Sequence, residues 1–209
     1  MWQEASKKIW IYSEPEVRLE ALITEVAGSK GVVIAHPHPL YGGDMHNNVV
    51  EALAGTYFKS GYTVLRFNFR GVGGSTGSFA NGIGEAKDLK AAFNYLKDLG
   101  KDQLAVAGYS FGAWVIALCL NELDSIDHIV FVSPPVSMLD FSFVKGLNKK
   151  MLVITGDFDE IAPKDEIASL ISKWSPYAKL RIIKGADHFY WGYTKEIKEV
   201  LTEFLKDES

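Results

Sequence analysis

The chain reads QLAVAGYSFGAWVIALCL from Gln103 to Leu120. Residues 103–109 are a short, mostly apolar run typical of a buried strand, and residues 111–122 are a largely apolar segment of helical length. Between them, GYSFG at 108–112 places Ser110 in the turn with a glycine two residues away on either side. In a sharp strand-to-helix turn, bulkier residues at the glycine positions would collide with the neighbouring strand and helix. The stretch therefore predicts a buried strand, a tight turn that exposes Ser110, and a buried helix.

Strand-like and helix-like segments alternate along most of the chain. The predicted strands are 8–12, 17–26, 31–35, 62–69, 103–109, 128–132, 151–155 and 180–183, and the predicted helices are 48–59, 83–99, 111–122, 164–174 and 194–206. Helices between short, continuously apolar strands are typical of a mostly parallel sheet covered on both faces. We therefore expect an α/β fold with about eight strands. Because no linker, repeat or low-complexity tract interrupts the chain, we expect a single domain over residues 1–209.

The pattern Gly-x-Ser-x-Gly occurs twice, and its surroundings distinguish the two serines. GGSTG at 73–77 lies in a loop rich in Gly, Ser and Thr, with no helix directly after it. With 19 glycines in the chain, one accidental match is plausible. We interpret Ser75 as a residue of a flexible loop. The match at 108–112 lies between a strand and a helix, as a nucleophilic serine requires, so Ser110 is the candidate nucleophile.

A serine hydroxyl is unreactive near neutral pH, so Ser110 needs a histidine as general base. Two histidines follow it in the chain. His128 begins an apolar strand, and we expect it to be structural. His188 lies between the last predicted strand and the last predicted helix, on a loop at the carboxyl end of the sheet, where the sites of parallel sheets gather. His188 is therefore the predicted base.

The base in turn needs an acid that orients it. Asp157 and Asp159 both follow the predicted strand 151–155, at the same edge of the sheet as the loop of His188. Asp187 is adjacent to the base in sequence, and we interpret it as a loop residue. From the residues alone, Asp157 and Asp159 are both candidates.

At this point the chain resembles the α/β-hydrolase superfamily. Its members often read Gly-x-x-Asp-x-x-x-Pro after the corresponding strand, and Gly156, Asp159 and Pro163 match that spacing. The resemblance implies that Asp159 is the acid and that Asp157 caps the turn. In this superfamily the acid lies between the nucleophile and the histidine in the chain, and this order is met here.

Two further segments extend the resemblance over nearly the whole chain. They are HPHPLYGG at 36–43 and FNFRGVGGS at 67–75. Together with the site residues they are similar to small hydrolases without a cap, related to dienelactone hydrolases and simple esterases. The resemblance implies an α/β-hydrolase fold without a substantial cap, and a serine hydrolase that cleaves a small carboxylic ester or thioester. Amide and lactone substrates are further alternatives. Dienelactone hydrolases proper have cysteine as the nucleophile in the strand-to-helix turn. This chain has Ser110 at that position, which argues against that particular activity.

Acyl transfer also needs backbone N–H groups that bind the developing oxyanion. We expect the Phe111 N–H, at the positive end of the helix, to be one donor. The loop after strand 31–35 should supply the second donor. Pro37 and Pro39 have no N–H, so Leu40 is the first choice and Tyr41 the second.

The chain between residues 135 and 151 is too short for a lid domain, so we expect an open or shallow pocket. The candidates that line it are Tyr41, Tyr109, Phe189 and Trp191.

Two other functions compete with this interpretation. His36 and His38, with Asp44 and His46 nearby, suggest a metal-dependent hydrolase, because imidazoles and carboxylates suit zinc. Two prolines interrupt that cluster, however, and a metal site would leave the serine turn unexplained, so no metal or cofactor is expected. The other alternative is a binding protein of the same fold without catalysis, because fold alone does not imply activity.

Charge and composition exclude further classes. The net charge is −4 and no basic stripe is present, which argues against nucleic-acid partners and against acidic membrane surfaces. The lone Cys119 excludes an internal disulfide and a four-cysteine zinc site, and its apolar neighbours predict a buried residue. We find no signal peptide and no apolar stretch of about 20 residues. We therefore expect a cytoplasmic protein whose partner is a small, ester-like substrate.

Overall fold

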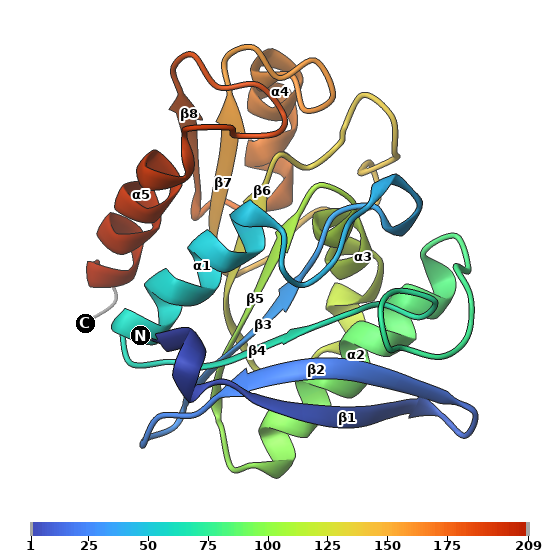
Figure 1. Cartoon of the computed structure of the whole chain (residues 1–209). Coiled ribbons are helices and arrows are strands. Elements are labelled where there is room, and N and C mark those ends of the chain that lie inside the picture. The colour runs from blue at the N-terminus through green and yellow to red at the C-terminus, as the bar shows by residue number, and fades with distance from the viewer. Residues whose placement is uncertain (1, 208–209) are drawn as a thin grey trace.

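The computed structural model of the chain describes residues 2–207, in which one sheet is flanked by helices (Figure 1). Its strands are β1 (Lys7–Glu14), β2 (Val17–Thr24), β3 (Lys30–Ala35), β4 (Thr63–Phe67), β5 (Gln103–Tyr109), β6 (Ile126–Val132), β7 (Lys150–Gly156) and β8 (Ala178–Ile183). Its α-helices are α1 (Asn48–Lys59), α2 (Ile83–Asp98), α3 (Phe111–Cys119), α4 (Lys164–Trp174) and α5 (Thr194–Lys206). Short 3₁₀ helices are η1 (Trp2–Ala5), η2 (Pro39–Tyr41) and η3 (Leu120–Glu122).

The eight strands lie in the order β1-β2-β4-β3-β5-β6-β7-β8. β1 pairs with β2, and β2 with β4, in antiparallel fashion, whereas every other neighbouring pair is parallel. This confirms the predicted mostly parallel sheet of about eight strands. β3, β5, β6, β7 and β8 run in one direction, so the loops after them meet at one edge of the sheet.

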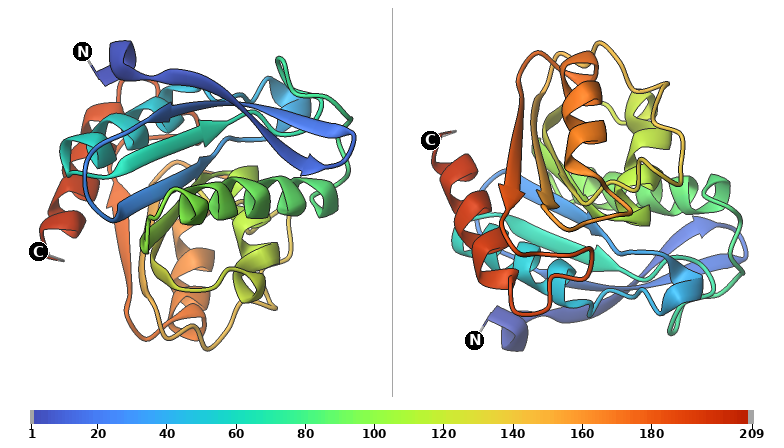
Figure 2. Two further views of the ribbon diagram at one scale, coloured as in Figure 1. Left: turned by 90° about the horizontal axis from the view of Figure 1, so that it is seen from below. Right: turned by 90° about the horizontal axis from the view of Figure 1, so that it is seen from above.

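The helices cover the two faces of the sheet in two groups. α1 and α5 lie on one face, and α2, α3 and α4 lie on the other (Figure 2). Each group closes its own apolar cluster against the sheet. Leu53 and Leu201 are fully buried in one cluster, and Phe93 and Trp174 in the other. Because both faces are covered, the parallel strands are continuously apolar rather than alternating.

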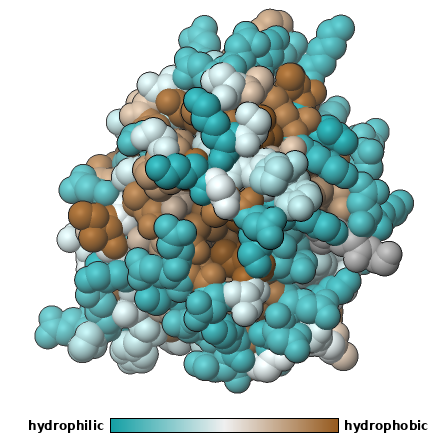
Figure 3. All heavy atoms as spheres, turned by 180° about the vertical axis from the view of Figure 1, so that it is seen from behind, coloured by the Kyte–Doolittle hydropathy of each residue, from teal (hydrophilic) through white to brown (hydrophobic). Residues whose placement is uncertain are grey.

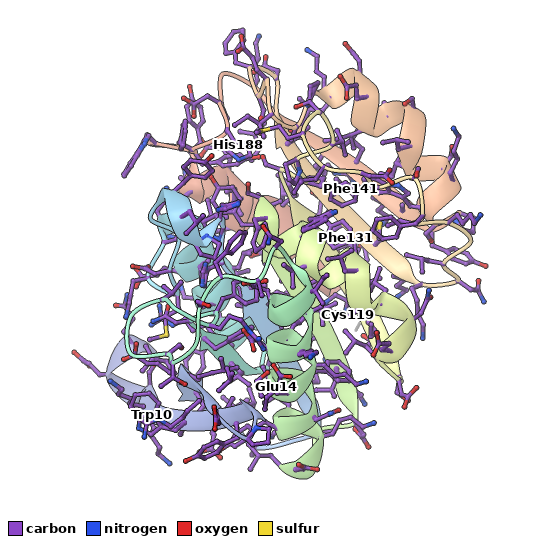
Figure 4. The ribbon with its side chains drawn as sticks, turned by 90° about the vertical axis from the view of Figure 1, so that its right-hand side faces the viewer. Trp10, Glu14, Cys119, Phe131, Phe141 and His188 are labelled. Carbon is purple, nitrogen blue, oxygen red and sulfur yellow. The ribbon has the colours of Figure 1, made fainter. Side chains whose placement is uncertain are left out.

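The cluster under α2, α3 and α4 is rich in aromatic rings. The ring centroids of Phe131 on β6 and Phe141 lie 6.3 Å apart, and the two rings meet edge to face (Figure 4). Seen from behind, hydrophobic residues appear between hydrophilic ones on this side of the molecule (Figure 3). Cys119, at the end of α3, is buried as predicted, and burial raises the pKa of its thiol to about 12. It therefore packs as a small apolar residue.

Four predicted elements end earlier than the sequence suggested, β2 by two residues and α2 by one, and the differences at β4 and α3 have a clear cause. β4 stops at Phe67 rather than 69. The Asn68 N–H still donates to the carbonyl of Glu20 on β2 at 2.8 Å, but the Phe69 N–H turns away from the sheet and donates to His36 Nε2 at 3.0 Å. The predicted helix 111–122 tightens into a 3₁₀ turn after Cys119. Both differences are set by long-range bonds or helix-end geometry that periodicity does not report.

The segment between β6 and β7 contains no helix or strand. It therefore forms no cap over the carboxyl edge of the sheet, as predicted. Within residues 2–207, no helix is both long and apolar enough to cross a bilayer.

Candidate active site

The turn between β5 and α3 holds Ser110 in a strained backbone conformation. Its φ is 53° and its ψ is −120°, in a region that non-glycine residues rarely occupy. The Ser110 N–H donates to the carbonyl of Val132 at the end of β6, at 2.9 Å. A Cβ at Gly112 would overlap the carbonyl of Ala35 at the end of β3. The turn therefore fits between β3 and β6 only because glycine occupies position 112.

The loop between β8 and α5 brings His188 to this turn. The Nε2 atom of His188 lies 2.9 Å from Ser110 Oγ. Its Nδ1 atom lies 3.0 Å from each carboxylate oxygen of Asp159. A carboxylate can only accept, so Nδ1 carries the ring proton and Nε2 turns its lone pair toward the hydroxyl. The structure thus joins the three residues that the sequence singled out in one hydrogen-bonded row.

All three side chains are largely withdrawn from water. Ser110 and His188 are each 8% exposed, and Asp159 is 4% exposed. His188 lies at the opposite end of the molecule from Trp10 and Glu14 on β1 (Figure 4). In this setting a hydrogen bond is electrostatically stronger than in water, so the orientation of the imidazole is well defined.

The carboxylate of Asp159 is stabilised in its charged form. Burial by itself opposes ionisation, but hydrogen bonds from His188 and Ser133, the electrostatic attraction of the His188 ring and the backbone N–H of Ala162 together lower the pKa of Asp159 below its usual value. The N–H groups of Ile161 and Ala162 donate to Oδ1 at 3.0 and 2.8 Å. Asp159 is therefore a fixed anion facing the imidazole.

The other two aspartates near the site have different partners. Asp157 Oδ1 accepts the N–H of Gly185 at 2.6 Å and so links the loop after β7 to the loop of His188. Asp187 Oδ1 accepts the N–H of Phe189 at 2.9 Å. A Cβ at Gly156 would overlap the carbonyl of Ala186, so the two loops can approach only because this position is glycine. This close approach explains why glycine occupies position 156.

Of the predicted oxyanion donors in the described part of the chain, the N–H of Phe111 is unpaired, whereas the N–H groups of Leu40 and Tyr41 are hydrogen-bonded. Within residues 2–207, the N–H of Phe111, at the start of α3, has no hydrogen-bond partner. The Leu40 N–H donates to His38 Nδ1 at 3.2 Å, and the Tyr41 N–H donates to the carbonyl of His38 at 3.1 Å. The prediction for the second donor is therefore corrected, because both N–H groups are used inside the η2 turn. The N–H of His38 has no partner in the same part of the chain.

The predicted pocket residues divide into two groups. Tyr41 and Trp191 are 83% and 75% exposed, and Phe189 is also exposed. Tyr109 was predicted with them, but it is buried, and its hydroxyl donates to the carbonyl of His188 at 2.6 Å. It therefore supports the histidine loop instead of lining a pocket.

Other exposed apolar side chains lie on the loops at the same edge of the sheet. We call the whole set the apolar collar: Leu40, Tyr41, Met138, Phe158, Phe189 and Trp191. These loops follow β3, β6, β7 and β8. A separate hollow of about 950 Å³ lies between β1, α2 and α3, and none of the three hydrogen-bonded residues lines it.

The histidines that suggested a metal site are engaged in other ways. His36 donates from Nδ1 to the carbonyl of Pro37 at 2.7 Å and accepts the Phe69 N–H at Nε2. His38 accepts the Leu40 N–H at Nδ1. Within residues 2–207, no three His, Cys, Asp or Glu side chains are grouped closely enough to hold a metal ion. These two imidazoles shape the β3 loop.

The remaining sequence candidates have structural partners. His128 is buried, with its Nε2 2.9 Å from the hydroxyl of Tyr57, and so forms part of the packing between α1 and the sheet. Sequence reasoning assigned no role to Ser133, whose hydroxyl donates to Asp159, and it considered Tyr190 only as an aromatic residue near the pocket, whereas its hydroxyl contacts Ser133. The signal for Ser133 was its place just after strand 128–132, at the same edge as Ser110.

Comparison with known proteins agrees with this fold. A family model described as the alpha/beta hydrolase fold matches residues 32–148. The chain belongs to this family. The predicted α/β-hydrolase fold without a substantial cap is therefore confirmed by the match and by the sheet itself.

Solved α/β-hydrolase structures resemble the chain over nearly its full length. An alpha-beta serine hydrolase homologue from Coxiella burnetii is 34% identical, with a TM-score of 0.88, over 95% of this chain and 97% of that one. XC6422 from Xanthomonas campestris, a serine hydrolase without a lid, is 30% identical, with a TM-score of 0.87, over 97% and 94%. The esterase Pf2001 from Pyrococcus furiosus is 25% identical, with a TM-score of 0.81, over 97% and 92%. These likenesses support a hydrolase.

Proposed function

We propose that this α/β-hydrolase is a serine hydrolase that cleaves small carboxylic esters, or thioesters, through an acyl-enzyme on Ser110. The observation that carries the proposal is the hydrogen-bonded row from Ser110 Oγ through His188 to Asp159. A hydroxyl next to an unprotonated imidazole nitrogen, with a carboxylate behind the ring, is the arrangement that makes serine nucleophilic.

In the first half of the reaction, Ser110 Oγ attacks the carbonyl carbon while its proton passes to His188 Nε2. The imidazolium that forms is stabilised by the carboxylate of Asp159, which stays ionised. The carbon–oxygen bond to the leaving group then breaks, and His188 gives its proton to the departing alkoxide. In the second half, water loses a proton to His188 and attacks the acyl carbon. The bond between the acyl carbon and Ser110 Oγ then breaks, and His188 returns the proton to Oγ as the carboxylic acid departs.

We assign the two oxyanion donors to the N–H groups of Phe111 and His38. The end of β3 lies beside the serine turn, since Ala35 pairs with Gly108 on β5. The ring of His38 is 4.7 Å from the ring of Phe111, so the two residues are neighbours. Each such donor typically contributes about 3–4 kcal/mol to transition-state stabilisation.

The substrate we propose is a neutral ester with an apolar acyl group. The acyl group would pack against the apolar collar, which is an open surface and not an enclosed pocket. Exposed apolar patches commonly mark binding sites. Glu160 and Asp187 are exposed beside Phe158 and Phe189, and they would repel an anionic acyl chain. Because the net charge is −4 and the lone cysteine is buried, we extend the proposal to a cytoplasmic protein without nucleic-acid or membrane partners.

A labelling experiment joined to a substrate series tests the proposal. A fluorophosphonate probe should label Ser110 and no other residue, as read by mass spectrometry of the digested protein. Chromogenic esters of acetate, butyrate and octanoate should be hydrolysed, and the succinate half-ester should be hydrolysed at least about tenfold more slowly. Absence of both labelling and turnover would favour the non-catalytic binding protein instead.

A further inference from the structure

A buried pair of hydroxyl groups lies behind the carboxylate of Asp159. Ser133 Oγ is 2.6 Å from Asp159 Oδ2 and 2.7 Å from the hydroxyl oxygen of Tyr190. The serine hydroxyl has a single proton, which it donates to the carboxylate, so the contact to Tyr190 requires the tyrosine to be the donor. Burial raises the pKa of Tyr190, and its phenol therefore keeps the proton that it donates. The bonds run in one direction, from Tyr190 to Ser133 to Asp159.

The backbone at both residues is strained. Ser133 has a φ of 45° and Tyr190 a φ of 54°, both in the left-handed region that side chains other than glycine seldom adopt. Both side chains are fully buried. Such conformations persist only where the surroundings enforce them, and they tend to cluster at functional sites. The strain thus marks the same two residues that the hydrogen bonds single out.

This hydroxyl pair connects three loops that are distant in sequence. Ser133 follows β6, Asp159 follows β7, and Tyr190 follows β8, two residues after His188. A second tyrosine, Tyr109 on β5, binds the carbonyl of His188, and its ring lies 6.2 Å from that of Tyr190. The bond between Tyr190 and Ser133 therefore fixes the loop of the imidazole relative to the loop of the carboxylate.

We propose that Ser133 and Tyr190 are positioning residues of this site: Tyr190 orients the Ser133 hydroxyl, and that hydroxyl holds the Asp159 carboxylate against His188. The assignment rests on the proposed function, because it supposes that His188 acts as a base. Neither residue contacts the reacting oxygen of Ser110; both act through Asp159.

Loss of the Ser133 hydroxyl should have two consequences. The carboxylate loses a donor to its charged form, so the pKa of Asp159 rises and its charge interacts more strongly with the imidazolium. The acidic limb of the kcat/KM profile should then move upward by about one pH unit, as expected for a lost hydrogen bond to a charged group. The other ionisable groups that face this row are Asp187 on the same loop and Tyr109 on β5. They are unchanged in the variants and leave the comparison intact.

The variants are chosen to separate chemistry from folding. Ser133→Gly removes the hydroxyl and tolerates the positive φ, and Tyr190→Phe removes only one oxygen. We expect Ser133→Gly to lower kcat about tenfold with KM within about twofold, and Tyr190→Phe to lower kcat about threefold. In the double variant, Tyr190→Phe should add nothing, since its effect passes through Ser133.

Tyr57→Phe is the matched control. Tyr57 is also fully buried, and its hydroxyl is hydrogen-bonded to His128, away from this edge of the sheet. Removal of that hydroxyl should lower thermal stability and leave kcat and the acidic limb where they are in the parent. A control that moved the acidic limb as far as Ser133→Gly does would overturn the assignment.

A proton NMR measurement reads the same contact without substrate. The proton between His188 Nδ1 and Asp159 should give a low-field resonance, displaced in Ser133→Gly, displaced less in Tyr190→Phe and unchanged in Tyr57→Phe. An unchanged resonance and kcat in both site variants would overturn the inference while Ser110→Ala still loses turnover. If instead Ser110→Ala retains turnover, the proposed function fails, and the resonance still shows whether the two hydroxyls hold Asp159. If Ser133→Gly does not fold, Tyr190→Phe decides alone.

Discussion

The two segments GGSTG at 73–77 and GYSFG at 108–112 share one pattern and have opposite surroundings. Ser75 and Ser110 are both 8% exposed, so burial does not distinguish them. The hydroxyl of Ser75 donates to the carbonyl of Asn68 at 2.7 Å and accepts the N–H of Glu20 at 2.9 Å. The hydroxyl of Ser110 faces an imidazole. A serine is thus made structural or reactive by its partners, and the pattern by itself decides neither.

The loop of Ser75 also differs from its prediction. It lies in a loop, as expected, but the loop is anchored rather than flexible. The N–H of Thr76 donates to the carbonyl of Arg18 at 2.9 Å, and the N–H of Gly74 donates to Glu20 Oε2 at 2.7 Å. Both partners are on β2, which follows β1 in a hairpin at the edge of the sheet. Composition indicated mobility because it does not report these long-range bonds.

The strongest test of this comparison exchanges each serine for alanine. Ser110→Ala should lower kcat for a chromogenic ester by at least about 10⁴-fold, because the nucleophile is removed. Ser75→Ala should keep kcat within about threefold of the parent, because its hydroxyl bonds only to backbone. Equal losses in the two variants would contradict the distinction.

The same test applies to the two aspartates that competed in the sequence. Asp159→Asn should lower kcat about 10³- to 10⁴-fold, since an amide can donate to Nδ1 and so favours the wrong tautomer of His188. Asp157→Asn should cost less than about tenfold, because its amide oxygen can still accept the Gly185 N–H. Steady-state rates at pH 8 measure both, and a larger loss in Asp157→Asn would reverse the assignment of the acid.

The contrast between anchored and reactive groups extends to the histidines. Burial lowers the pKa of His36 to about 4. In the unfolded chain, His36 therefore binds a proton near pH 6.5, whereas in the folded protein it does so only near pH 4. The free energy of unfolding should fall by about 3 kcal/mol as pH decreases through that window, and this contribution should level off below it.

Urea denaturation at pH 7, 5.5 and 4.5 measures this loss, and NMR titration of the His36 ring protons isolates its source. A His36 ring that becomes charged near pH 6.5 in the folded protein would contradict the buried, neutral assignment.

The smallest expected effect is on stability, where the order of the two serines reverses. Ser75→Ala should lower the free energy of unfolding by about 1–2 kcal/mol, because the Asn68 carbonyl and the Glu20 N–H lose their partner. Ser110→Ala should change it by no more than about 0.5 kcal/mol, since its hydroxyl anchors no backbone group. Urea midpoints at pH 7 give both values. A larger loss for Ser110→Ala would mean that its hydroxyl, too, is structural.

The elements were predictable because they depend on short-range patterns. The periodicity of residues 48–59 and 164–174 gave the bounds of α1 and α4, and the glycines around Ser110 indicated a strand-to-helix turn. His188 was predictable for a related reason: parallel strands direct their carboxyl ends to one edge, so chain position is sufficient to place a loop there. Asp159 was separated from Asp157 only by a resemblance to known hydrolases.

The sequence could not predict the role of residues whose role depends on which hydrogen-bond acceptor they find in the fold. Leu40 and Tyr41 were the predicted second oxyanion donors, but in the structure their N–H groups donate to His38 within the η2 turn. The sequence showed Tyr109 only as an aromatic residue at a strand end, whereas in the structure its hydroxyl donates to the carbonyl of His188. Each outcome depends on an atom that only the folded turn or a distant loop supplies.

The sequence by itself determined the order of strands and helices and the location of the strand-to-helix turn that holds Ser110, because local apolar spacing and glycine positions specify both. The tertiary structure alone decided which polar atoms stay unpaired and which are saturated. This division has a physical cause: most buried donors and acceptors need a partner, and the partner commonly lies in a segment that only folding brings near.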